Sequence, residues 1–600
     1  MSARRLVSAA LASAALLVPG IAPAQEAPSD DGRIVAVLAN SQELIDDLRF
    51  IVADLAGAKS AWEDDVFPNI DVFLFGVDKQ EPVGADVVFD ADSGRRLVLH
   101  IPVDDRPVFI SDNLNAADII TKLVRGQRDL YQLSGVFEGW MRFTQPSGMP
   151  RYASISTKPE DIPEGMPSPK KKYTPILAAG GDAAVRWFAT AENAGKREKG
   201  FETLKQNLLE AVKKRPDESQ AAFELRRLAV EQQADRLSRL LTNTASLSAD
   251  WRTDVRARKY GGASSIAGLP GTQLAAAIAS IGSEESRFAR IADGAGAVLT
   301  SRVLLPVTED YRTDQKRLYD AWLASWSETV DRKEGPTPDE KAARKQLAEH
   351  VVQLLSDSLQ LEWLDTFAEI APSEGDLYTA LIAVRVHDSS LVLPILEILP
   401  QVQQGWQVEL NAFEEQGVAV HRLELQEKSP KSLTEFFGES GILYVATGEQ
   451  TLWVAGGLNA ETSLRSAISS AAAAGGRPAS ADPVQVSMRV RPALRFIKTL
   501  LEDEDIQFVR SLNQSRLLKN TERKEDAESD EEDSSRRVSR DALKDFAWQD
   551  AALEGLSEGN DSLRLHVRKD GEALLGEMDV EEGVIRAVGF VVVEFAKLLR

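Results

Sequence analysis

The chain contains no cysteine among its 600 residues. It can therefore form no disulfide, no iron–sulfur cluster, no thiolate zinc site and no cysteine nucleophile. Histidine is scarce as well: the five histidines do not occur at metal-ligand spacings, and no His-Glu-x-x-His motif is present. We therefore expect no cofactor and no histidine-based metal centre. We expect several hydrophobic cores in place of covalent cross-links.

Basic residues are also under-represented. The 70 Lys and Arg residues are outnumbered by 93 Asp and Glu residues, which gives a formal net charge of −23 at pH 7. A chain of this sign is not expected to bind nucleic acid or anionic lipid through its overall charge. The charge is typical of a soluble surface, and it leaves open a basic partner or divalent cations.

The first residues, 1–24, predict a signal peptide. Arg4 and Arg5 are followed by an apolar core at 6–18 and by an Ala-Pro-Ala cleavage sequence at 22–24. We expect the Sec route instead of the twin-arginine route, because the Phe-Leu that usually follows the arginine pair is absent. The expected location of the exported chain is the periplasm, the cell surface or the exterior.

Beyond this signal, no apolar run is long enough to cross a bilayer. The best candidate, 584–593, contains Arg586, and its apolar residues have the spacing of one helix face. We therefore expect that the cleaved chain is not an integral membrane protein.

A phrase of the form Ser-Leu-x-(Ala or Leu)-x-(Trp or Val) occurs three times, beginning at Ser246, Ser358 and Ser562. Each occurrence alternates apolar and polar residues, which predicts a strand with one buried face. Helical patterns precede each phrase, and a second strand and a helix follow it. The last residue of each phrase is expected on the buried face: Trp251, Trp363 and Val567. We predict an α+β fold of repeated strand–helix–helix–hairpin–helix units, with antiparallel or mixed sheets and helices packed mainly on one face.

These patterns divide the chain into regions. After the signal peptide we predict a first α+β region, a proline-rich linker without regular structure, and three α+β units. Their bounds are, in this order, 33–143, 144–182, 183–282, 297–400 and 483–600. A further region, 377–474, overlaps the second unit. It is related to 33–143 because 107–116 and 452–460 both predict a strand that leads through Leu-Asn-Ala into a helix.

A charged insert at 519–540 lies within the last unit. It offers almost no apolar side chain to a core, so it predicts a disordered loop. Its carboxylates are candidates for weak cation binding, although the glycine and the spacing of a calcium-binding loop are absent. Docking to a basic partner is the alternative. The candidate residues are Asp526, Glu528, Asp530, Glu531, Glu532 and Asp533.

Catalytic motifs are incomplete. The Gly-Glu-Ser-Gly sequence at 438–441 lacks one residue of the nucleophile elbow, and the Ser-x-x-Lys at 168–171 lies in the proline-rich segment. Neither a P-loop nor a complete dinucleotide-binding glycine motif is present. The ten tryptophans mostly fall on apolar stripes, which favours core packing over carbohydrate stacking. We therefore assign no catalytic, cofactor-binding or metal residue.

Ala234-Asp235-Arg236-Leu237, a strand and then Gly268-Leu269-Pro270-Gly271-Thr272 follow one another in the sequence. This arrangement, with the acidic and cysteine-free composition, resembles long uncharacterised secreted proteins of planctomycete-type bacteria. The resemblance implies no catalytic residue.

The sequence favours an exported, non-catalytic interaction or scaffold protein of the bacterial envelope or exterior, whose partner is an unknown protein or envelope component. The second hypothesis is a carrier of a hydrophobic ligand, which requires a contiguous apolar cavity between sheet and helices. The third is a hydrolase of unrecognised type. It requires a cleft where two carboxylates, or a serine and a histidine, converge within hydrogen-bond reach.

Overall fold

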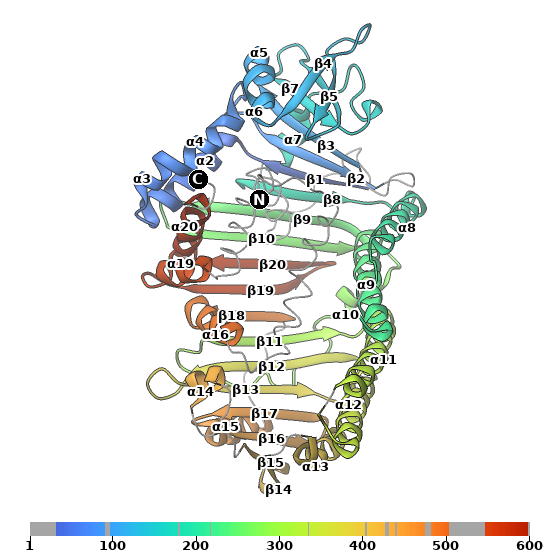
Figure 1. The fold of residues 1–600 in the computed structure, drawn as a ribbon, viewed down its shortest axis with the longest axis vertical. Helices are drawn as coiled ribbons and strands as arrows, with labels where there is room; N and C mark the ends of the chain where they lie inside the picture. Colours follow the sequence, from blue (N-terminus) through green and yellow to red (C-terminus); the bar gives the residue numbers. More distant parts are fainter. Residues whose placement is uncertain are drawn as a thin grey trace.

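In the computed structural model, every strand of the described residues belongs to one antiparallel sheet of 20 strands (Figure 1). The described residues are 32–89, 96–177, 181–215, 218–333, 335–402, 405–425, 431–438, 441–473, 482–502 and 547–597. The candidate cation ligands of the charged insert and the predicted signal peptide lie outside them.

The order of the strands in space differs from their order in the sequence. From one edge to the other it is β4 (Ile119–Leu123), β5 (Leu130–Gly135), β6 (Gly139–Thr144), β7 (Arg151–Ser156), β3 (Arg96–Val103), β2 (Val83–Val88), β1 (Arg33–Leu38), β8 (Ala183–Phe188), β9 (Thr244–Asp254), β10 (Lys259–Gly268), β20 (Ala573–Val580), β19 (Ser562–Asp570), β18 (Val484–Arg489), β11 (Leu299–Pro306), β12 (Trp363–Pro372), β13 (Tyr378–Arg385), β17 (Thr451–Gly457), β16 (Ile442–Gly448), β15 (Val418–Leu425) and β14 (Trp406–Glu415). The C-terminal strands β18 to β20 therefore lie in the middle of the sheet.

The register of the sheet assigns each strand residue to one of two faces. We call face A the face that carries Trp187, Leu247 and Val567. Trp187 is paired with Leu247, and Val567 is connected to the same face through the pairs that cross β20 and β10. Face B is the opposite face.

One column of helices covers face A along one set of strand ends, on the right in Figure 1. Leu241 and Phe201 of this column cluster with Trp187, and Leu354 clusters with Val445. The column consists of α8 (Ala194–Glu210), α9 (Gln220–Asn243), α11 (Glu309–Arg332), α12 (Pro338–Ser358) and α13 (Val392–Val402).

A second column covers face A along the other strand ends, on the left in Figure 1. Ile585 clusters with Tyr260 and Val580, and the ring of Phe436 stacks on Tyr378 with 5.9 Å between centroids. This column consists of α2 (Ser41–Arg49), the π-helix η1 (Phe50–Leu55), α20 (Glu582–Lys597), α19 (Ala547–Gly555), α16 (Val490–Glu502) and α14 (Lys431–Phe437).

Face B is covered by fewer elements. Helix α7 (Pro169–Leu177) buries Tyr173 against Val35 and Ala184. Helix α15 (Ala460–Ala472) and the segment 281–297 cover the other end, where Phe288 meets Trp453 edge-on at 5.3 Å. The described helical elements that belong to neither column and are not named above are α3 (Lys59–Ala61), η2 (Trp62–Val66), α4 (Phe67–Asp71), η3 (Val72–Leu74), α5 (Arg106–Val108), η4 (Phe109–Asn113), α6 (Leu114–Ala116), η5 (Pro159–Asp161), α10 (Gln273–Ser280) and η6 (Ser389–Leu391).

Polar side chains cap the first turns of several helices. Thr337 and Glu340 form a reciprocal capping box ahead of α12, with Pro338 in the first turn. Asn40 accepts from the backbone N–H of Glu43 at 2.6 Å and caps α2. Thr272 caps α10 in the same way.

The α+β class is confirmed, but the prediction of several antiparallel or mixed sheets is wrong, because the described strands form one sheet in which all pairs are antiparallel. Pairs such as β10–β20 and β11–β18 join segments that are far apart in the sequence. Alternation identifies a buried face of a strand, but it carries no information about which strand is the neighbour.

The prediction that 144–182 lacks regular structure is also wrong. The segment contains β7, η5 and α7. Pro159 and Pro169 stand at the start of η5 and α7, where a missing N–H costs no hydrogen bond. These two prolines therefore mark the starts of elements, whereas Pro175 lies inside α7.

The strand predicted within 107–116 is helical instead. Asp105 accepts from the N–H of Val108 and starts the helix, and Phe109 and Leu114 are buried on it. Short apolar runs do not distinguish strand from helix. Because 451–457 is strand β17, the correspondence between 107–116 and 452–460 does not hold in the structure.

The second Ser-Leu phrase also differs from its prediction. Ser358 is the last residue of α12, and β12 begins only at Trp363. Trp363 pairs with Pro306 and is buried on face B, whereas Trp251 and Val567 lie on face A. The three phrases therefore do not share one buried face.

A buried ion pair on face B provides a test of the fold. Arg186 donates to Asp250 at 2.5 Å and to the carbonyls of Ala249 and Ile176. We expect Arg186→Leu to destabilise the protein by about 3–5 kcal/mol, because it leaves the Asp250 carboxylate buried without its partner.

The measurement is a urea unfolding curve. Arg258→Leu is the matched control, because Arg258 also forms an ion pair, with Glu582, but is 58% exposed. This substitution should lower the free energy of unfolding by at most about 1 kcal/mol. The double variant Arg186→Leu/Asp250→Leu should recover much of the loss. Equal effects of the two single variants would contradict the argument.

Candidate functional site

The middle of face A lies between the two helix columns (Figure 1). The columns reach its margins: Trp251 and Met578 pack against the cluster of Leu55 and Ile585, and Val384, Leu452 and Val454 pack against the cluster of Leu354 and Leu396. Two adjacent rows of cross-strand pairs run through this region from β8 to β17, and we call them the apolar strip. The first row is Val185, Ala249, Ser264, Gly576, Val567, Val484, Val303, Thr366, Val384 and Leu452. The second row is Ala183, Trp251, Gly262, Met578, Leu565, Val486, Ser301, Ala368, Ile382 and Val454.

No residue of the apolar strip is charged, and the only hydroxyl groups are those of Ser264, Ser301 and Thr366. Most of its side chains are half-buried, and Ile382 is 49% exposed in the middle of its strand. With ten strands at a spacing of about 4.8 Å, the strip is about 45 Å long. It is a long, partly solvated apolar surface bordered by the two helix columns.

On each of these strands, the residue between the two rows points to face B. Together these residues form a third row, and several of them are charged. This third row includes Asp250, Glu577, His566 and Arg302. The charge difference between the faces follows from the alternation of each strand. The usual arrangement would place the uncharged face in a core and the charged face in water, yet the centre of face A remains partly exposed.

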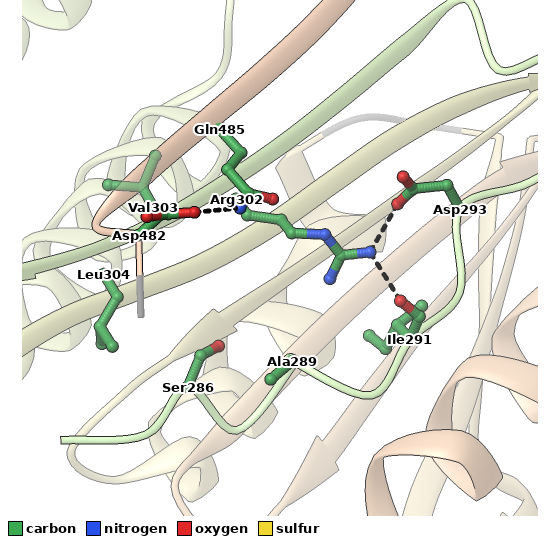
Figure 2. A pocket seen from close by; sticks show the side chains of 9 residues that line it. All are labelled: Ser286, Ala289, Ile291, Asp293, Arg302, Val303, Leu304, Asp482 and Gln485. Carbon is green, nitrogen blue, oxygen red and sulfur yellow. Dashed lines mark hydrogen bonds and ion pairs between the residues drawn. The ribbon is translucent and has the colours of Figure 1, made fainter. Parts of the chain in front are cut away.

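A pocket of about 220 Å³ lies on face B (Figure 2). At its centre, Arg302 donates to the Asp293 carboxylate and the Ile291 carbonyl, both at 2.6 Å. Its guanidinium also lies 4.7 Å from the centre of the Phe367 ring. The lining residues are Ser286, Ala289, Ile291, Asp293, Arg302, Val303, Leu304, Asp482 and Gln485.

The charges of this pocket already have partners. Asp482 lies 2.6 Å from His566 Nε2 and 3.2 Å from the Gln485 amide. Arg302 ties the segment 281–297 to β11, so its hydrogen bonds fix a loop on the sheet. A polar space of this size does not provide the contiguous apolar cavity that the carrier hypothesis required.

A serine, a histidine and an aspartate converge on the N-terminal part of face B. A hydrogen bond of 2.8 Å joins Ser154 Oγ and His100 Nδ1, and His100 Nε2 lies 3.8 Å from Asp86. Lys172 donates to Asp86 at 2.8 Å. Burial would raise the pKa of Asp86, but the neighbouring His100 and the charge of Lys172 outweigh it, so the pKa lies below its ordinary value.

This group does not form the cleft that a hydrolase needs. Ser154, His100 and Asp86 are at most 5% exposed, and Tyr173 of α7 packs against the His100 ring at 6.1 Å. Reacting groups must reach a substrate, and these are enclosed between α7 and the sheet. We interpret them as a polar network that holds α7 in place.

The predicted site residues are not tested by the described structure. The acidic candidates of the insert lie outside it, and within it no three His, Asp or Glu residues are arranged to hold a metal ion. None of the described helices combines the length and apolar character that a membrane span requires. The apolar strip was missed in sequence because its residues come from ten strands whose neighbours the sequence did not reveal.

Three carboxyl groups lie together where α2 meets the sheet. Glu43 and Asp47 of α2 face Asp182, which accepts from the N–H of Thr253 at the end of β9. Burial and the negative charge of Asp182 raise the pKa of Asp47 to about 7. Burial and the same charge raise the pKa of Glu43.

Comparison of the chain with protein-family models, with curated proteins and with solved structures finds no match. The apolar strip and the chemistry of its surroundings are therefore the features of this chain that bear on its function.

The raised pKa of Asp47 predicts a pH dependence of stability. Between its unfolded pKa of 3.8 and about 7, the folded state binds more protons than the unfolded state, so stability falls as pH rises through this window. We expect Asp47→Asn to reduce this pH-dependent loss of stability by about 1–2 kcal/mol. The effect is limited to this size because Asp47 is half-exposed and solvent partly screens its charge.

Thermal unfolding from pH 4 to pH 8 measures this effect. Asp46→Asn, on an exposed neighbour of the same helix, is the control and should keep the wild-type slope. An Asp47→Asn protein with an unchanged slope would show that this carboxyl group does not cause the pH dependence.

Proposed function

We propose that this chain is an exported, non-catalytic binding protein, and that the apolar strip holds the hydrocarbon chain of a lipid-like ligand. The observation that carries the proposal is the absence of charge from 20 positions, most of which are partly solvated. At the average of 27% charged residues, about five charges would be expected on a surface of this size, and a large apolar patch that remains exposed usually marks a binding site.

The chemistry of the strip favours a hydrocarbon over a polar chain. The strands beneath it pair on both sides, so their backbone groups are used within the sheet. A peptide or a sugar chain would find only three hydroxyl partners, and each polar group left unpaired would cost about 1–3 kcal/mol. A buried CH₂ group instead gains about 0.8 kcal/mol.

The width of the strip also favours a hydrocarbon. Its two rows are separated by two residues along each strand, which corresponds to about 7 Å. A helix with its side chains is about 10–12 Å wide, which exceeds the separation of the two rows. An amphipathic helix is the alternative occupant that the binding test must distinguish.

We also infer that the strip is built from three related units, 183–282, 297–400 and 483–600. Each has a strand, two helices and a hairpin, and in each the first strand pairs with the first strand of the hairpin: β8–β9, β11–β12 and β18–β19. These units supply nine of the ten strands of the strip. The shared order of strands and helices supports the inference that the binding surface arose by repetition of one structural unit.

A dansyl-labelled long-chain fatty acid tests the proposed function. We expect its fluorescence to rise on binding to the purified chain. Ile382→Glu should weaken the affinity by about tenfold or more, because a carboxylate in the middle of the strip must lose water when the chain binds. Leu97→Glu is the matched control: Leu97 is 53% exposed on β3, three strands beyond the end of the strip.

Three results would count against the proposal: no binding of the fatty acid, equal affinity of the Ile382→Glu variant, or equal loss in the Leu97→Glu control. Binding of an amphipathic helical peptide with no binding of the fatty acid would identify the helix as the occupant and overturn the lipid proposal. Native mass spectrometry of the freshly purified chain should reveal bound lipid in the wild type and less in Ile382→Glu.

A further inference from the structure

The sheet is open at both ends. Among the described strands, β4 pairs only with β5, and β14 pairs only with β15. Each of these edges presents backbone N–H and C=O groups that no described strand uses. Natural proteins usually protect such edges, because an exposed edge can pair with another strand.

The β4 edge is apolar and basic. Ile120, Val136 and Leu123, in β4 or just after β5, are 65%, 59% and 56% exposed, the highest values among the large apolar side chains of the described chain. Lys122 and Arg125 are exposed there and make no ion pair with any described residue. This basic edge belongs to a protein with a net charge of −23.

The β14 edge has the opposite charge. Its sequence contains Glu409, Glu414 and Glu415 and no basic residue. Arg465 binds Glu415 at 3.1 Å, whereas Glu409 and Glu414 have no ion-pair partner among the described residues. The pairing with β15 shifts between Glu409 and Phe413, so the segment before this irregularity, 406–409, is a straight piece of edge.

We propose that β4 of one copy of this chain pairs with β14 of a second copy, so that the sheet continues from molecule to molecule. The pairing satisfies the free backbone groups of β4 and of 406–409, covers Ile120, and brings the basic Lys122 and Arg125 to the end of β14 that carries Glu409. The straight piece of β14, 406–409, has four residues and β4 has five, so this piece can pair with most of β4.

Charge decides which edges meet. Two β4 edges would place Lys122 and Arg125 against themselves, and two β14 edges would do the same with Glu409 and Glu414, which is unfavourable in both cases. The remaining pairing joins different surfaces of the two copies. Contacts of this head-to-tail kind do not close a dimer; they generate a ring where the rotation between copies closes and an open row where it does not.

Sedimentation velocity of the full chain tests the proposal. We expect the average mass of the wild type to increase with protein concentration, and to decrease when salt is added, because the attraction involves exposed charges. Lys122→Glu and Glu409→Lys should each weaken association by about tenfold or more. Both residues are exposed, so circular dichroism should confirm that the variants fold.

A mixture of the two charge-reversed proteins is the decisive experiment. In the mixture, the carboxylate introduced at position 122 of one protein meets the ammonium group introduced at position 409 of the other. The unchanged Lys122 likewise meets the unchanged Glu409, so association should return. Ile382→Glu, in the apolar strip, is the control and should associate like the wild type. A failure of the fatty-acid experiment leaves this outcome unaffected, because no residue is common to the two surfaces.

Three results would overturn the proposal. A wild type that remains monomeric at all concentrations excludes the contact. Association that neither charge reversal weakens places the contact elsewhere. Single variants that weaken association without recovery in the mixture exclude the pairing of β4 with β14.

Discussion

The backbone hydrogen bonding between neighbouring antiparallel strands is the constraint from which the other features of this structure follow. It connects 20 strands without a break from β4 to β14, and it joins segments that are hundreds of residues apart, as in the pair of Tyr260 and Val580. Since side chains alternate along every strand, the register of these pairs decides which side chains share a face. Cores, helix positions and the candidate site all follow from it.

The register has its clearest consequence in the centre of the sheet. It aligns uncharged residues from ten strands on face A, while charged residues such as Asp250 and Glu577 occupy the intervening row on face B. The helix columns cover the ends of these strands, so the cores lie in two lines with a partly exposed apolar strip between them. The same hydrogen bonding leaves two edges of opposite charge without a partner strand among the described residues. The proposed ligand binding and the proposed self-association therefore use different parts of one open sheet.

Much of the local structure was predictable. The strands predicted from alternation for the first and third Ser-Leu phrases are confirmed as β9 and β19. The predictions were wrong where a short apolar run is compatible with either a strand or a helix, or with burial on either face of the sheet. The segment around Phe109 is helical because Asp105 caps it, and Trp363 packs on face B because β12 pairs with β11 through Pro306. Neither partner could be identified from the sequence.

Local sequence patterns were enough to establish the α+β class, the ends of many helices, the absence of cysteine chemistry and the alternation that makes each central strand uncharged on one side. These properties depend on residues that are close together in the chain. The folded chain was needed to show that all described strands join one sheet, that Ala368, Ile382 and Val454 become neighbours, and that helices leave them partly exposed. Strand pairing depends on long-range contacts, and a local pattern does not specify them.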